Sequence, residues 1–142
     1  MTFARQLAAG GAAGLFALLG AAGSAQTAKL APGTYRQIDT VTKKALAPGN
    51  QIVVVAAKGG RIAFSVSALA QTDATLGSVV GVIPATLPAT WSQSRATGNC
   101  RLTFESVPHG IRVIQDAAFG DCGFGAGISA SGTYQLVAEK PL

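Results

Sequence analysis

The sequence predicts an all-β protein, specifically a small antiparallel up-and-down β-barrel of about eight strands. Apolar and polar residues alternate along short segments such as Arg61–Leu69, where Ile62 and Phe64 share one face. Gly, Pro and Asn interrupt the chain between these segments, as they do at turns. The first and last segments also begin alike, with Gly33-Thr-Tyr and Gly132-Thr-Tyr. Similar chemistry at both ends is what neighbouring strands that close a barrel would show.

Turn signals divide the chain into eight expected strands. They cover residues 33–38, 50–57, 61–69, 76–83, 89–95, 100–107, 111–115 and 128–137. Gly59-Gly60 and Pro108-His109-Gly110 are typical of hairpin turns. An open sheet of this size would leave two exposed edges, so closure into a barrel is favoured, with a two-sheet β-sandwich as the alternative. A composition of 49% hydrophobic and 12% charged residues is also that of a folded domain rather than a disordered chain.

The first 25 residues have the pattern of a secretory signal peptide. Arg5 supplies a positive charge, Leu7–Ala22 carries none, and the small residues of Gly23–Ala25 suit cleavage by signal peptidase. We therefore expect residues 1–25 to be removed and residues 26–142 to form a single β-barrel domain. That domain would be periplasmic or secreted, with no transmembrane segment after cleavage. A retained anchor is the alternative, although an Ala- and Gly-rich stretch inserts only weakly into a membrane.

Cys100 and Cys122 are the only two cysteines. Export places them in an oxidising compartment, and they lie 22 positions apart rather than in the C-x-x-C spacing of redox pairs. We therefore expect a structural disulfide, which would add on the order of 3 kcal/mol of stability. Two Cys and one His cannot supply four conventional zinc ligands, and no cofactor or metal is expected.

The sequence contains no recognisable catalytic arrangement. His109 is the only imidazole and lies in an expected turn, the six acidic residues are not clustered, and no serine lies in a G-x-S-x-G elbow. Gly125-Ala-Gly127 lacks the following helix that a nucleotide-binding loop needs. These glycines more simply allow a tight return or a bulge beside the disulfide. We therefore expect that the protein is not an enzyme.

Basic residues outnumber acidic ones, and the loss of Arg5 with the leader would change the net charge from +5 to +4. Lys43 and Lys44 precede a second basic pair, Lys58 and Arg61, in the next turn region. Together they are a candidate basic patch, with ordinary surface charge as the alternative. A basic protein favours anionic partners, such as an acidic protein or an anionic component of the cell envelope. Nucleic acid is not an expected partner, because the chain lacks a pattern of basic residues interleaved with aromatic ones.

The last third of the chain carries a distinctive pattern, Cys122-Gly-Phe-Gly followed by Ser131-Gly-Thr-Tyr134. It resembles a group of small exported proteobacterial β-barrel domains and, more distantly, is similar to the periplasmic C-type lysozyme inhibitors. That resemblance implies an eight-stranded barrel with a disulfide, and a loop with a Ser-Gly-x-x-Tyr motif that plugs the lysozyme cleft. Ser129, Ser131 and Tyr134 are therefore candidate contact residues.

These observations predict an exported, non-catalytic binding protein that contacts a protein or an anionic envelope component. Inhibition of a lytic enzyme is one version of that function. Two alternatives remain: an accessory subunit of a periplasmic enzyme complex, and a carrier of a small apolar ligand inside the barrel, since eight-stranded barrels can hold one. The sequence leaves the oligomeric state open.

Overall fold

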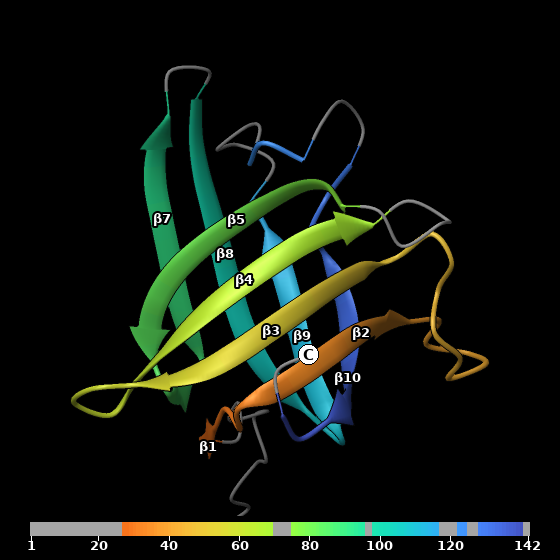
Figure 1. The fold of residues 1–142 in the computed structure, drawn as a ribbon, viewed down its shortest axis with the longest axis horizontal. Coiled ribbons are helices and arrows are strands. Elements are labelled where there is room, and N and C mark those ends of the chain that lie inside the picture. The colour runs from red at the N-terminus through yellow and green to blue at the C-terminus, as the bar shows by residue number, and fades with distance from the viewer. Residues whose placement is uncertain (1–26, 70–74, 96–97, 117–121, 125–127, 141–142) are drawn as a thin grey trace, which may run out of the picture.

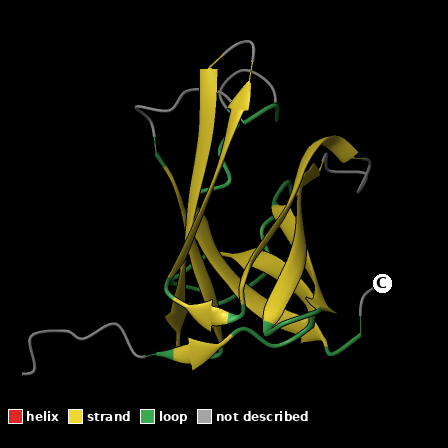
Figure 2. Cartoon of the chain, turned by 90° about the vertical axis from the view of Figure 1, so that its left-hand side faces the viewer, coloured by secondary structure: helices red, strands yellow, loops and turns green. Residues whose placement is uncertain are grey.

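The structure, a computed structural model, describes residues 27–69, 75–95, 98–116, 122–124 and 128–140. Every regular element in these ranges is a β-strand, which confirms the predicted all-β class (Figure 2). Within the same ranges, no helix is present that is long and apolar enough to span a membrane. The expected signal peptide, residues 1–25, lies outside the described residues.

Eight of the ten strands form one antiparallel sheet. They are β2 (Gly33–Ile38), β3 (Asn50–Ala57), β4 (Arg61–Leu69), β5 (Thr75–Pro84), β7 (Ala89–Arg95), β8 (Gly98–Val107), β9 (Gly110–Gln115) and β10 (Gly132–Ala138). Their spatial order is β5-β4-β3-β2-β10-β9-β8-β7. The sheet curls so that β2–β5 cross in front of β7–β10 (Figure 1). Two short strands, β1 (Ala28–Lys29) and β6 (Thr86–Leu87), pair separately.

The first and last long strands pair with each other, as their similar sequences predicted. Tyr35 of β2 lies opposite Leu136 of β10, and Arg36 lies opposite Gln135. The sheet therefore forms a nearly closed barrel. Among the described residues, no ladder joins the two outermost strands, β5 and β7, which are consecutive long strands in the chain. We call the gap in hydrogen bonding between them the seam.

An aromatic side chain packs across the seam. Trp91 of β7 meets Phe64 of β4 edge-to-face, with ring centroids 5.5 Å apart. Gly81 of β5 lies between them, and a Cβ at that position would come within 2.7 Å of the Phe64 ring and would also clash with the indole. Because Gly81 has no side chain, the ring of Trp91 fits at this position. Here side-chain packing holds the two strands together in place of backbone hydrogen bonds.

The barrel interior is filled by the inward-facing residues of all eight strands. The predicted alternation is confirmed on β4, where Ile62, Phe64 and Val66 are all buried. The largest fully buried side chains are Tyr134, Phe104, Phe124, Ile52, Ile83, Leu87, Leu102, Ile111, Val54, Val66, Val113 and Thr34.

Both predicted hairpins are present. Gly59 and Gly60 have φ values of 71° and 70°, and an added Cβ at either position would meet nothing within 4 Å. Between β8 and β9, Pro108 is followed by His109 with a φ of 64°. Pro at the second position and a positive φ at the third are typical of a type II turn.

Candidate functional site

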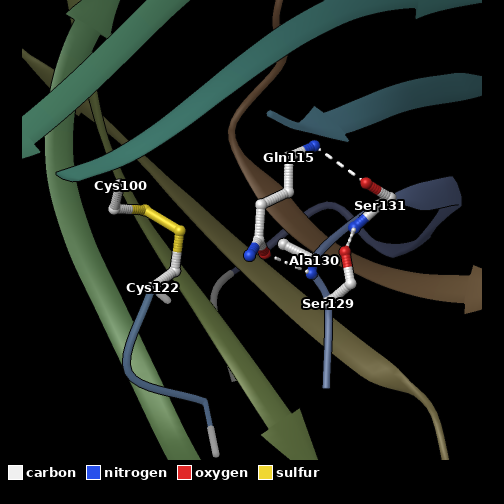
Figure 3. Close-up of a disulfide and its surroundings, with 6 residues drawn as sticks. All are labelled: Cys100, Gln115, Cys122, Ser129, Ala130 and Ser131. Atoms are coloured by element: carbon white, nitrogen blue, oxygen red, sulfur yellow. Dashed lines mark hydrogen bonds between the residues drawn. A yellow bond between two sulfur atoms is a disulfide. The ribbon is translucent and has the colours of Figure 1, made fainter. Parts of the chain in front are cut away.

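The predicted disulfide joins Cys100 of β8 to Cys122, with 4.8 Å between the two Cα atoms (Figure 3). It holds the short segment Cys122–Phe124 against the opposite side of the seam. A Cβ on Gly77 of β5 would lie 2.6 Å from the carbonyl oxygen of Gly123 and 3.1 Å from the Cα of Phe124. The segment therefore bridges β8 and β5, and the buried ring of Phe124 joins the core. Of the predicted glycine-rich return, residues 117–121 and 125–127 lie outside the described part of the chain.

Hydrogen bonds hold the loop that precedes β10, and Figure 3 shows three of them. The Ser131 hydroxyl accepts from the backbone N–H of Gln115 at 2.8 Å, and the Gln115 side-chain carbonyl accepts from the N–H of Ala130 at 2.9 Å. The Ser129 hydroxyl accepts from the N–H of Ser131 at 3.0 Å. Residues 128–131 were expected to belong to the last strand. That expectation is wrong, because side chains rather than a neighbouring strand take up these N–H groups.

Tyr134 anchors the same loop from inside the barrel. Its hydroxyl donates to the carbonyl oxygen of Ala130 at 2.6 Å and accepts from the Asn50 side-chain amide at 3.1 Å. The Asn50 amide also donates to the carbonyl oxygen of Ser129 at 2.7 Å. Burial raises the pKa of Tyr134 well above its usual value. The three residues predicted as contacts therefore lie together, but Tyr134 is fully buried and only Ser129 and Ser131 reach the surface.

The four predicted basic residues lie in two separate places. Lys43 and Lys44 are exposed in the connection before β3, whereas Lys58 and Arg61 are exposed at the hairpin after it (Figure 1). A strand of this length separates them by about 23 Å. The structure does not bring the two pairs into one patch.

The two pairs also differ in their electrostatic surroundings. The carboxylate of Asp39 lies near Lys43, where it accepts hydrogen bonds from the N–H groups of Val41 and Thr42. These bonds, first that of Thr42, hold the pKa of Asp39 below its usual value, and the Lys43 charge adds to the effect. In the part of the chain that the structure describes, neither Lys58 nor Arg61 pairs with a carboxylate.

An apolar surface that the sequence reasoning missed lies on the outer face of β3, β4 and β5, the face turned away from β7–β10. In register, Ser65 of β4 lies between Val53 and Val80. Ala63 lies in the same way between Val55 and Val82. The exposed fractions are 46% for Val55, 67% for Val80 and 41% for Val82. We call this surface, a hollow of about 390 Å³, the valine trough; its lining residues are Val53, Val55, Ala63, Phe64, Ser65, Val80, Gly81 and Val82.

Positive charge lies at one end of the valine trough. Arg61 lies on the same face of β4 as Ala63 and Ser65, and Lys58 lies in the adjoining turn. Between Thr40 and Phe104 the only acidic residue is Asp73, which falls outside the described residues. Among the described residues neither cation pairs with a carboxylate, which leaves both charges available to an anionic group at this end.

A sequence signal for the valine trough exists. Ile52–Val55 is continuously apolar rather than alternating, so both faces of β3 must carry apolar side chains. Val79–Ile83 is apolar throughout as well, broken only by Gly81. Such runs are usual in strands covered on both faces. On a barrel wall, however, they leave one apolar face in water.

A second hollow, of about 450 Å³, lies at the end of the barrel where β1 meets the β8–β9 turn. Leu30, Leu87 and Tyr35 line its apolar part, and Lys29 and His109 line it as well. Among the residues that the structure describes, no three His, Cys, Asp or Glu side chains lie close enough to hold a metal ion.

Comparison of the chain with protein-family models, with curated proteins and with solved structures finds no match. Its function is therefore inferred from its own surfaces.

Proposed function

We propose that the protein is an exported, non-catalytic binding protein that holds its partner on the valine trough. The observation that supports this is the exposure of three valines on one face of the hydrogen-bonded sheet, Val55 on β3 and Val80 and Val82 on β5, with the small outward residues of β4 between them. Burying an exposed valine side chain contributes on the order of 1 kcal/mol, so covering the set is a sizeable driving force. Contiguous exposed apolar surface is typical of an interaction site.

Two further features favour partner binding on the outer face of the barrel over an internal ligand or inhibition of a lytic enzyme. The interior is occupied by Tyr134, Phe104 and Phe124, which gives a carrier of an internal ligand less support. Inhibition of a lytic enzyme through the Ser131–Tyr134 segment would need side chains offered to the partner, whereas Tyr134 and the 129–131 loop are engaged in internal hydrogen bonds. We therefore assign partner binding to the valine trough.

Crosslinking in cells tests this proposal. A photoactivatable residue replaces Val80 in the full-length chain. In the matched control, the same photoactivatable residue replaces Val137, a valine of β10 that is 55% exposed. We expect adducts from position 80 and few from position 137. Equal yields at both positions, or none at position 80, would contradict the proposal. The mass of the adduct shows whether the partner is a protein or a lipid.

A further inference from the structure

We propose that the partner of the valine trough is an anionic lipid surface, with acyl chains along β4 and acidic head groups at Arg61 and Lys58. This inference rests on the proposed function, because it names the partner of the same surface. It is carried by the shape of the hollow, by the distribution of charge around it, and by the kind of side chain that lines it.

The register of the strands makes the surface an elongated channel. Its floor is β4, whose outward residues Ala63 and Ser65 are small, and its walls are the valines of β3 and β5. Neighbouring strands lie about 4.8 Å apart, so the two walls stand roughly 10 Å apart at the backbone. Valine side chains narrow that space to about the width of one hydrocarbon chain. The channel therefore suits a slender apolar group lying lengthwise.

One end of the channel lies next to two positively charged side chains. Arg61 follows the hairpin that begins with Lys58, so both cations lie where a chain in the channel would emerge. Arg61 can bind a phosphate through two parallel hydrogen bonds, which a lysine cannot do. The ion pair of Glu105 with Arg112 lies on the opposite wall, on β8 and β9. An anionic surface would thus meet the cationic end without meeting that carboxylate. The exposed Glu139 follows Ala138, which lies two strands away from Val53, beyond β2.

The side chains that line the valine trough favour a lipid partner over a protein partner. Tight protein interfaces usually centre on Trp, Tyr or Arg, and Val is under-represented among the residues that dominate their affinity. The exposed side chains of the valine trough are valines with no aromatic among them. A second copy of this chain would carry the same net positive charge, so two copies would repel each other rather than supply a complementary charge. A flexible acyl chain, in contrast, can lie along a narrow aliphatic channel without an aromatic anchor.

Vesicle co-sedimentation with the purified exported protein tests the inference. Vesicles of phosphatidylcholine are compared with vesicles in which part of the lipid is phosphatidylglycerol. We expect sedimentation with the anionic vesicles, and a loss that increases with salt because exposed charges are screened. The variant Val80→Ser should weaken binding about tenfold, and Arg61→Gln about fivefold with a shallower salt dependence.

Val137→Ser is the matched control, since it removes an exposed valine from β10 and should leave vesicle binding unchanged. Thermal unfolding of each variant shows that the fold is retained. No binding to anionic vesicles, equal binding to neutral ones, or equal losses from Val80→Ser and Val137→Ser would overturn the lipid inference. If crosslinks from position 80 still reach a protein, the proposed function survives that failure. If position 80 yields no adduct either, both proposals fail.

Discussion

The phenol ring of Tyr134 lies in the core, and its hydroxyl connects β10 to two other parts of the chain. It donates to Ala130 in the loop before β10 and accepts from Asn50 at the start of β3. The donated bond requires the protonated phenol, and a buried phenolate would be poorly solvated. Burial therefore raises the pKa of Tyr134, and it raises the pKa of Tyr35 as well.

Stability should consequently fall at high pH. The protonated phenols stabilise the fold fully below about pH 10, the pKa of an unfolded tyrosine. As the pH rises further, the unfolded chain releases these protons while the folded chain retains them, so the free energy of unfolding decreases. Urea unfolding of Tyr134→Phe should show a shallower decrease above about pH 10. At neutral pH the variant should be about 1–2 kcal/mol less stable, because Asn50 and Ala130 lose a partner.

Tyr35→Phe is the matched control for this measurement. The Tyr35 hydroxyl donates to the carbonyl oxygen of Ala31 at 2.7 Å and does not touch the 129–131 loop. This variant should retain the part of the pH dependence that comes from Tyr134. If the free energy of unfolding of Tyr134→Phe fell as steeply above about pH 10 as that of the unmodified protein, the pH dependence could not be assigned to Tyr134.

At the scale of strands and loops, local patterns predicted most of the fold. The alternation along β4 and β8 depends on neighbouring residues alone, and the structure reproduces it. The loop at residues 128–131 depends instead on Gln115, a residue from another strand whose side chain binds Ala130. A contact of this kind between distant residues is not encoded in any local window of the sequence. The valine trough is different, because it lies on three consecutive strands and its apolar runs, Ile52–Val55 and Val79–Ile83, are visible in the sequence.

The prediction at the scale of strands and loops concerns the disulfide and the segment Cys122–Phe124 that it holds. Replacing Cys100 and Cys122 together by serine should lower the free energy of unfolding by about 3 kcal/mol, because the unfolded chain is no longer constrained by the crosslink. The Cys122–Phe124 segment should also leave β5, exposing the buried Phe124 ring. Urea unfolding measures the first effect, and limited proteolysis near residue 124 measures the second. The single variant Gln115→Ala, which releases only the neighbouring loop, should leave residues 122–124 protected. Equal protease protection in both proteins would contradict the bridging role.

The whole barrel is closed by β2 and β10 and left without backbone pairing at the seam. The matching Gly-Thr-Tyr starts of these two strands predicted the closure. They did not predict the seam, because it results from the path of residues 84–89 between β5 and β7. There Pro84 and Pro88 lack N–H groups, and β6 pairs with β1 instead of extending either long strand. The two edges consequently diverge, and Trp91 packs between them.

Hydrogen exchange should reveal this asymmetry in the intact molecule. Amides in the β2–β10 ladder should exchange only with global unfolding, whereas amides of β5 and β7 that point into the seam should exchange much faster. Trp91→Ala should destabilise the fold by about 2 kcal/mol, because it removes a partly buried ring from Phe64 and Gly81. It should accelerate exchange in β5 and β7 more than in β2 and β10. Thr90→Ala, an outward-facing change on the same strand, should leave the pattern intact. Uniform protection around the barrel, or equal acceleration of every strand by Trp91→Ala, would show that the seam is not a weak point.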